Sequence, residues 1–388
     1  MKKKIVFVFG ALGGGGAQRQ FGWLIEGIDK DFFEPIIVTI GTNENKAKEH
    51  LITYPRPTDL DEVGKKEEFG KYFLYRKLKN VNVKTFFVDR NGFFSVCKTL
   101  KKIIKEQKPE LIFNTTPMAM SYSFLPSLLF SSAKVIHGVR GNGILLSYKR
   151  NIYNLFHLIS QIGIDYFVCN SKGLEKNINR NGYYKKKIKV IYNGVPTFFN
   201  RSFDNEDFVP SNTIRVALIG RFDKVKDHDM FIKAINYLKT KREFSVHLYG
   251  AGELESELQK KIIELGLEQK IIIEGWITDV SEVLKITDVV CLTSIFEGFN
   301  NSISEAQMHG IPVVTTNCTG SNEIVVHEKT GFVVPINDDK EFSKKLQLLI
   351  DDDVIRMEFS KNAYMRSREE FSIPTMVKSY ESFFEEIL

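Results

Sequence analysis

Short apolar runs alternate with helix-period segments along most of the chain, and this alternation limits the folds open to it more than any other feature. The runs are continuously apolar, which is typical of strands buried on both faces of a parallel sheet. A first series of predicted strands covers residues 5–9, 35–40, 83–88, 111–114, 135–139, 166–170 and 189–192. A second series covers residues 215–220, 245–250, 271–274, 289–293 and 313–315. Strands joined by helices in this way predict two α/β domains, each built on a doubly wound parallel sheet.

The length of 388 residues is too great for one ordinary core and fits two domains of similar size. The first series of strands ends at Asn193 to Pro196, and a polar stretch precedes the second series. We therefore predict one domain at residues 1–198 and another at residues 199–372. Residues 42–80 are polar, charged and longer than a usual connection, so we interpret them as a partly helical insertion.

Composition indicates a globular protein of the cytoplasm. Hydrophobic residues make up 43% of the chain and the mean hydropathy is −0.17. No apolar run reaches the roughly 18 residues that a membrane-spanning helix needs. The apolar segment after the first lysines is too short for a signal peptide and fits a first buried strand. Four widely spaced cysteines, Cys97, Cys169, Cys291 and Cys318, indicate core thiols in a reducing compartment rather than a metal site.

The formal net charge of +6 is modest, but the basic residues are unevenly placed. A basic stretch runs from Lys134 to Lys189 and contains only two acidic residues, Asp165 and Glu175. Its other basic members are Arg140, Lys149, Arg150, Lys172, Lys176, Arg180, Lys185, Lys186 and Lys187. Two interpretations stay open, a solvated face or a face beside an anionic membrane or a phosphorylated acceptor. No nucleic-acid-binding motif accompanies the charge, so we do not expect nucleic acid as a partner.

Two glutamates lie eight positions apart across a predicted strand-to-helix junction. Glu297 lies on the loop at the carboxyl end of a buried strand, and Glu305 lies about one turn into a helix that begins at Ser302. The backbone amides at the start of a helix lack partners within the helix and bind anions readily. This arrangement suits a sugar that is attached to a phosphate.

A second loop, from Gly220 to His228, follows a strand and carries Arg221 and Lys226 five positions apart. Together with Glu297 and Glu305, this loop resembles the signature of the family-4 retaining glycosyltransferases, the glycosyl transferases group 1. The resemblance implies the GT-B fold, in which two Rossmann-like domains face a cleft and the second domain holds the donor nucleotide. It also implies that the final helix, residues 373–388, packs back on the first domain.

The resemblance assigns expected roles to individual residues of the second domain. Arg221 and Lys226 would clamp the donor diphosphate in place of a metal, with Lys224 as an alternative partner. Glu297 would hydrogen-bond the donor sugar and face the reacting carbon, and Glu305 would accept hydrogen bonds from the ribose hydroxyls. The other residues expected at the donor are Gly220, Gly250, Gly275, Trp276, Ile277, Phe299, Asn300, Asn301 and Ser302. Trp276 could equally serve packing or stacking, and Asn300 stands where the family often has proline, which leaves the identity of the donor open.

The glycine-rich loop after the first strand would face the donor phosphate through Gly15 and Gly16. Its spacing differs from a dinucleotide fingerprint, and no carboxylate follows the second strand, so NAD is not expected. A tight turn alone is the alternative. His137 and Arg140 leave another strand toward the same edge, where some family members have a histidine and others an arginine at the donor sugar. For His137 the sequence leaves packing and catalysis open.

The expected reaction is the transfer of a hexosyl group from a nucleotide diphosphate sugar, with a UDP-sugar as the expected donor. The acceptor would be a hydroxyl of a polysaccharide or lipid-linked oligosaccharide, and the anomeric configuration would be retained. No cofactor or metal is expected, and the enzyme would lie in the cytoplasm or peripherally at the inner face of the plasma membrane. The alternatives are a UDP-sugar 2-epimerase of the same fold and a sugar-binding protein without catalysis. The sequence does not name the donor sugar, the linkage or the oligomeric state.

Overall fold

The computed structural model describes residues 1–10, 16–41, 45, 78, 81–141, 163–180, 187–197, 213–277 and 279–388. The chain forms two compact units, Met1–Gly194 with Ile373–Leu388, and Val195–Ser372. The insertion predicted at residues 42–80 lies almost wholly outside the described residues. In the described part of the chain, no helix is both long and apolar enough to cross a membrane.

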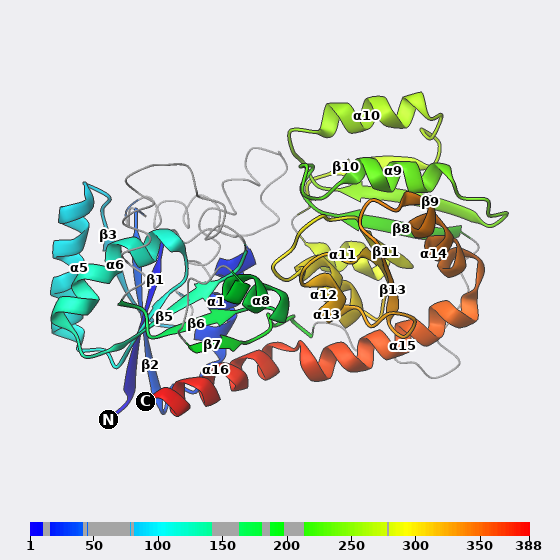
Figure 1. The fold of residues 1–388 in the computed structure, drawn as a ribbon. Coiled ribbons are helices and arrows are strands. Elements are labelled where there is room, and N and C mark those ends of the chain that lie inside the picture. Colours follow the sequence, from blue (N-terminus) through cyan, green and yellow to red (C-terminus); the bar gives the residue numbers. More distant parts are fainter. Residues whose placement is uncertain are drawn as a thin grey trace. The chain divides into compact units, whose positions relative to one another are not determined.

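A parallel sheet forms the centre of the first unit, with its strands in the order β3-β2-β1-β4-β5-β6-β7 (Figure 1). The strands are β1 (Lys3–Phe9), β2 (Phe33–Ile40), β3 (Lys84–Val88), β4 (Leu111–Asn114), β5 (Lys134–Val139), β6 (Tyr166–Cys169) and β7 (Lys187–Val190). The strand order reverses between β1 and β4, because the chain builds outward from β1 to β3 and then outward from β4 to β7. The predicted doubly wound sheet is confirmed.

Helices cover both faces of this sheet because successive residues of a buried strand point to opposite faces. Among the described residues of this unit, the helices are α1 (Gly16–Gly27), α5 (Phe93–Gln107), α6 (Pro117–Phe130), α8 (Lys172–Arg180) and α16 (Ile373–Ile387). Val6 and Val8 of β1 pack in one cluster with residues of α5 and α6. Ile5, Phe7 and Phe9 pack in another cluster with residues of α1 and α16.

The aromatic residues of α16 are buried in the first unit. Phe384 contacts Phe33 with ring centroids 6.0 Å apart, and Tyr380 contacts Phe113 at the same separation. Phe383 lies edge-on to Tyr166 at 5.5 Å. Large aromatic side chains bury more apolar area than any others, so α16 belongs to the core of a unit that is remote from it in sequence.

A second parallel sheet forms the centre of the unit Val195–Ser372, with its strands in the order β10-β9-β8-β11-β12-β13. The strands are β8 (Thr213–Ile219), β9 (Glu243–Tyr249), β10 (Ile271–Gly275), β11 (Val289–Leu292), β12 (Val313–Thr316) and β13 (Gly331–Val334). The helices are α9 (His228–Asn236), α10 (Glu255–Glu264), α11 (Val280–Lys285), α12 (Asn301–Met308), α13 (Ser321–Ile324), α14 (Asp339–Asp351) and α15 (Asp353–Glu370). The sequence did not predict β13 as a strand. Its four residues pair with β12 in register from Val313 with Gly331.

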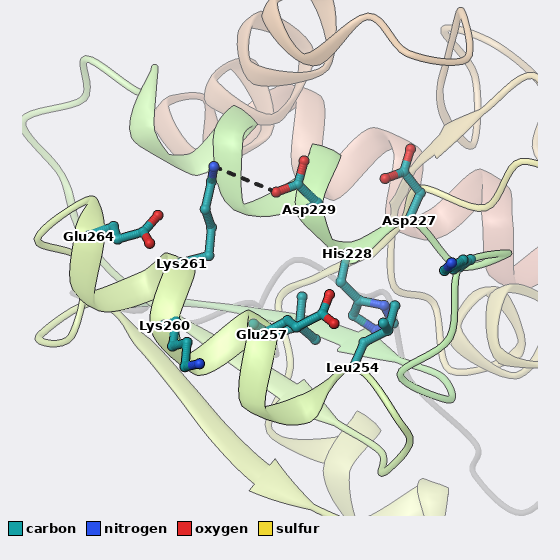
Figure 2. A pocket seen from close by; sticks show the side chains of 10 residues that line it. Asp227, His228, Asp229, Leu254, Glu257, Lys260, Lys261 and Glu264 are labelled. Atoms are coloured by element: carbon teal, nitrogen blue, oxygen red, sulfur yellow. Dashed lines mark ion pairs between the residues drawn. The ribbon is translucent and has the colours of Figure 1, made fainter.

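A hollow of about 420 Å³ lies between α9 and α10, and Figure 2 shows the side chains that line it. His228, the first residue of α9, lies at this hollow but is almost fully buried, with its ring edge-on to Phe222 at 5.0 Å. Within the described structure, neither ring nitrogen has a hydrogen-bond partner. Burial lowers the pKa of this imidazole to about 4, so His228 is neutral near neutral pH.

We predict that His228 makes the stability of the protein depend on pH. An unfolded histidine takes up a proton near pH 6.5, whereas the folded one resists protonation until about pH 4. Its contribution is therefore complete above about pH 6.5 and is lost as the pH falls toward 4. In His228→Phe, the fall in unfolding free energy between about pH 7 and about pH 5 should be smaller by on the order of 2 kcal/mol. Urea unfolding followed by circular dichroism measures this, and equal falls in both proteins would contradict it.

Candidate active site

The candidate site lies at the carboxyl edge of the second sheet, where the strand order reverses. β8 and β11 are neighbours, with Val216 opposite Val289 and Leu218 opposite Cys291. From this pair, β9 and β10 extend to one side, and β12 and β13 extend to the other. The loops that leave β8 and β11 diverge at such a switch point, which is where open α/β sheets bind ligands.

The two loops bring Lys226 and Glu297 together. The ammonium of Lys226 lies 2.6 Å from Oε1 of Glu297, and the two side chains are only 15% and 16% exposed. The hydroxyl of Ser294 also donates a hydrogen bond to this carboxylate oxygen, at 2.9 Å. Two donors on one oxygen fix the carboxylate, and the carboxylate in turn holds the ammonium at the edge of the sheet.

Hydrogen bonds to the backbone fix both loops. Thr293 donates its hydroxyl to the carbonyl oxygen of Lys226 at 2.9 Å, and the amide of Ile295 donates to the carbonyl of Val225 at 2.8 Å. Thr316, the last residue of β12, donates to the carbonyl oxygen of Ser294 at 2.6 Å. Hydrogen bonds to these main-chain groups therefore hold the two loops that carry the ion pair.

Arg221 and Lys224 lie in the same loop but in different surroundings. Arg221 is 74% exposed and lies 2.9 Å from a carboxylate oxygen of Asp223. The other oxygen of Asp223 accepts from the amides of Val225 and Lys226, at 3.1 and 3.2 Å. Lys224 is exposed and lines the hollow between α9 and α10. Of the two lysines in this loop, Lys226 is the one beside Glu297.

Glycines allow the neighbouring loops to pack directly on the loop after β8. A Cβ on Gly250 would lie 1.9 Å from the carbonyl oxygen of Gly220, and Gly250 has a φ of +156°. The amide of Gly220 donates to the carbonyl of Tyr249 at 2.9 Å, and the amide of Gly250 donates to the carbonyl of Gly275. Any side chain at Gly250 would push these loops apart. A Cβ on Gly220 would lie 3.3 Å from Cε of Lys226, so the alkyl chain of this lysine lies over Gly220.

The residues after β10 lie partly open to solvent. Trp276 is more than half exposed, and Ile277 is half-buried. The sequence left packing and stacking open for Trp276, and this exposure is not that of a packed core side chain. The ring is therefore accessible to a ligand at the carboxyl edge of β10.

The helix α12 begins at Asn301, directly after the Glu297 loop. Asn300 caps it, because its side-chain oxygen accepts from the amide of Ile303 at 3.0 Å. The neighbouring Phe299 is buried, with its ring centroid 5.7 Å from that of Phe371, whereas Asn301 and Ser302 are half-buried. An N-cap also explains why asparagine fits at Asn300.

Glu305 lies in the middle of α12 and is buried. The backbone of Gly320 packs closely against the Glu297 loop, because a Cβ on Gly320 would lie 2.5 Å from the carbonyl oxygen of Gly298. Cys318 lies in this region as well. Burial raises the pKa of its thiol, and its sulfur lies 3.0 Å from the hydroxyl of Ser321.

In the first unit, His137 and Arg140 make contacts within the protein. His137 is completely buried in β5, with Nδ1 3.2 Å from the carbonyl oxygen of Asn114 and its ring edge-on to Phe167. These are the surroundings of a packed histidine, and we do not include His137 in the proposed mechanism. Gly15 lies outside the described residues, and Gly16 is the first residue of α1.

Arg140 links three parts of the first unit. Its guanidinium donates to the side-chain oxygen of Asn193 at 2.9 Å and to the hydroxyl of Tyr380 at 2.5 Å. It also lies over the ring of Phe21, with 4.8 Å between the guanidinium carbon and the ring centroid. These contacts hold α16 to the end of β5, which is a structural task that the expectation of donor binding did not include.

Sequence reasoning missed Ser294, Thr293 and Thr316. Each is a small hydroxyl residue at the end of a strand, and such residues are common there for reasons of packing alone. Only the neighbouring positions of β8, β11 and β12 show that their hydroxyls support Lys226 and Glu297. A hydroxyl residue at the ends of two adjacent strands was the one available signal.

Comparisons with known proteins agree with this geometry. Residues 14–198 match the family described as Glycosyltransferase Family 4, and residues 200–366 match the family described as Glycosyl transferases group 1. A similar protein is the N-acetylgalactosamine-N,N'-diacetylbacillosaminyl-diphospho-undecaprenol 4-alpha-N-acetylgalactosaminyltransferase of Campylobacter jejuni, 24% identical over 95% of each chain. The UDP-Gal:alpha-D-GlcNAc-diphosphoundecaprenol alpha-1,3-galactosyltransferase of Escherichia coli is 25% identical over 75% of this chain and 81% of its own.

Solved structures share the fold. HepE of Anabaena in complex with UDP superimposes with a TM-score of 0.76 at 18% identity, over all of both chains. The lipopolysaccharide outer core galactosyltransferase WaaB has a TM-score of 0.72 at 18% identity, over 99% of this chain and all of its own. The two family matches together span residues from the first unit to α15. The chain therefore belongs to the glycosyl transferases group 1, the family-4 glycosyltransferases of the GT-B fold.

Proposed function

We propose that this glycosyltransferase transfers a hexosyl group from a UDP-sugar to a hydroxyl of a lipid-linked oligosaccharide or polysaccharide, with retention of anomeric configuration. The observation that carries the proposal is the Lys226–Glu297 pair at the switch point of the second sheet. A cation and a carboxylate side by side suit a donor that joins a diphosphate to a sugar. Solved structures of HepE, which has this fold, contain UDP or UDP-glucose.

Cations at this edge would stabilise the leaving group. Negative charge builds on the diphosphate as its bond to the sugar breaks, and preorganised positive groups stabilise such developing charge. Lys226 is already held in place by Glu297 and mostly withdrawn from water. Arg221 is exposed, and an exposed ion pair such as that with Asp223 is weak, so little opposes its turning toward a phosphate. We propose that these two cations act in place of a metal ion.

The carboxylates and the start of α12 would hold the rest of the donor. In this proposal, Glu297 accepts hydrogen bonds from the donor sugar, and Glu305 accepts them from the ribose hydroxyls. The amides at the start of α12 face the phosphates, as the N-terminus of a helix favours anions. Trp276 and Ile277 lie beside the base. Gly220, Gly250 and Gly275 let the backbone approach the nucleotide.

Retention would follow from attack on the same face of the sugar that the diphosphate leaves. The bond between the anomeric carbon and the β-phosphate oxygen breaks, and the acceptor oxygen forms its bond to that carbon from the same side. The acceptor proton passes to the departing phosphate oxygen. Lys226 and Arg221 stabilise the negative charge on the departing phosphate. Because the acceptor oxygen attacks the anomeric carbon directly, no side chain has to serve as a covalent nucleophile.

The acceptor is proposed from the named activities of the relatives. Two similar transferases are named for acceptors linked to undecaprenol through a diphosphate. An acceptor of this kind is anchored in a membrane by its lipid. We therefore propose a cytoplasmic enzyme, peripheral at the inner face of the plasma membrane, whose first unit, Met1–Gly194 with Ile373–Leu388, holds the acceptor.

Incubation with a panel of UDP-sugars tests the reaction class. We expect slow release of UDP and free sugar without an acceptor, and faster release of UDP when lipid-linked saccharides are added. Mass spectrometry then identifies the extended acceptor. Formation of the 2-epimer of the donor would indicate an epimerase instead, and binding without any turnover would indicate a sugar-binding protein.

Lys226→Ala and Arg221→Ala should each lower turnover by about a hundredfold, because each removes one stabiliser of the developing charge. Lys224→Ala is a matched control, since it removes the same charge from the same loop without touching Glu297. The control should keep turnover near that of the wild type. A loss in Lys224→Ala as large as that in Lys226→Ala would contradict the assignment.

The same proteins test the absence of a catalytic metal. EDTA should leave the turnover of the wild type largely intact, because the proposed stabilisers are side chains. Loss of turnover in EDTA that magnesium or manganese restores would overturn the cation clamp.

Glu305→Ala should weaken the binding of UDP by roughly 10- to 150-fold, since a hydrogen bond to a charged group contributes about 1.5–3 kcal/mol. Isothermal titration calorimetry measures the change. Glu282→Ala, on the exposed side of α11, is the control and should bind UDP as the wild type does. Unchanged affinity in Glu305→Ala would remove Glu305 from the proposed site.

A further inference from the structure

The outer face of α5 carries a stripe of lysines that begins with an exposed aromatic residue. The buried side of this helix is formed by Val96, Leu100, Ile103, Ile104 and Gln107. The opposite side presents Phe94, Lys98, Lys101, Lys102 and Lys105, which recur at helical spacing. Phe94 is 84% exposed, which is unusual for so large an apolar side chain.

The end of α6 adds three consecutive exposed apolar residues, Leu128, Leu129 and Phe130. α5 and α6 lie side by side in the first unit (Figure 1). The ammonium groups of Lys101 and Lys105 lie 3.9 and 5.0 Å from the ring centroid of Phe130, so the lysine stripe adjoins this apolar end directly. We call the exposed residues of both helices the α5–α6 face.

The charge of this face is almost entirely positive. Glu106 is the one acidic residue within α5, and α6 has none. Glu106 lies 3.9 Å from Lys102 with both side chains exposed, and such a pair contributes little. Lys98 and Lys105 are exposed as well. A partner that covers this face therefore has to be anionic and has to accept apolar side chains.

We propose that the α5–α6 face binds the surface of an anionic phospholipid bilayer. Aromatic and leucine side chains enter the boundary between headgroups and acyl chains, while lysines extend their ammonium groups to the headgroups. Each lysine near such a surface strengthens binding, and screening by salt weakens it. A second copy of the chain fits less well, since a two-fold contact would bring two lysine stripes together. This inference rests on the proposed function, because an enzyme for lipid-linked saccharides works at a bilayer.

The basic stretch from Lys134 to Lys189 is a weaker candidate for the same role. Its described members are spread over several elements, since Lys134 begins β5, Arg140 follows β5, and others lie on α8 and β7. Arg140 is engaged with Asn193 and Tyr380, and Lys189 lies 3.1 Å from a carboxylate oxygen of Glu386. Lys149, Arg150, Lys185 and Lys186 lie outside the described residues.

Sedimentation with vesicles tests the proposal. The wild type should sediment with vesicles of phosphatidylcholine and phosphatidylglycerol at low salt, and much less with phosphatidylcholine alone. Lys98→Glu/Lys102→Glu should lower the affinity for anionic vesicles by at least about tenfold, because each lysine adds roughly fivefold. Phe94→Glu/Leu129→Glu should lower it similarly. Phe94 and Leu129 are 84% and 62% exposed, so these changes remove little packing.

Two matched controls carry the same chemical changes elsewhere. Lys361→Glu/Lys378→Glu changes the net charge equally at exposed positions, and Val354→Glu/Met365→Glu replaces exposed apolar residues of α15. Both controls should sediment as the wild type does. In all variants, UDP binding and the slow hydrolysis of the soluble donor should persist, which shows that the proteins are folded.

Several outcomes overturn the proposal. They are equal sedimentation of wild type and α5–α6 variants, no sedimentation of the wild type, and equal binding to neutral and anionic vesicles. Light scattering that finds a wild-type dimer broken by Phe94→Glu/Leu129→Glu, without vesicle binding, would assign the face to a second copy. If the proposed function is wrong, donor hydrolysis is absent in every variant, and that result is separate from the vesicle result.

Discussion

The adjacency of β8 and β11 is the constraint on which the candidate site depends. The register that places Val216 opposite Val289 also places the ends of both strands together, although more than 60 residues separate them in the chain. Parallel strands end at one edge, so their loops carry Lys226 and Glu297 to one point. The same edge receives Thr316 from β12 and the close packing of Gly250 on Gly220. A shift of one residue in β11 would turn its side chains to the opposite face of the sheet and move Glu297 out of place.

The Lys226–Glu297 pair is better understood as preparation for a ligand than as a source of stability. Withdrawing two charges from water costs free energy that their attraction only partly offsets, so partly buried pairs contribute little to folding. The surrounding hydroxyls of Ser294 and Thr293 reduce that cost, because they satisfy the carboxylate and the lysine backbone. A cation that is already desolvated and oriented needs little reorganisation when charge develops nearby, and this is the condition under which electrostatic stabilisation of a transition state is large.

The sequence predicts most of the fold because short continuous apolar runs that alternate with helix-period segments are typical of buried parallel strands. β13 (Gly331–Val334) was not predicted, and its pairing with β12 identifies it as the edge strand of the second sheet. The sequence motif pointed to Glu297, Glu305 and Lys226 as site residues. It did not predict the contact between Lys226 and Glu297, because that contact arises from the strand order. The contacts of Arg140 were also beyond the sequence. Its partner Tyr380 lies 240 positions away, and only the return of α16 to the first unit brings the two together.

Burial and neighbours, rather than residue type, decide what each lysine of this protein does. Lys226 is withdrawn from water against a carboxylate, which fixes its position and suits it to a phosphate. Lys224, two residues earlier, is exposed at the hollow between α9 and α10. Lys101 is half-buried, and its ammonium group lies 3.9 Å from the ring centroid of Phe130, in a cation–π contact. In the formal net charge of +6, each of these three lysines counts equally, although their surroundings differ. The chemistry of a basic chain therefore depends on which of its lysines the fold desolvates, and against which partner.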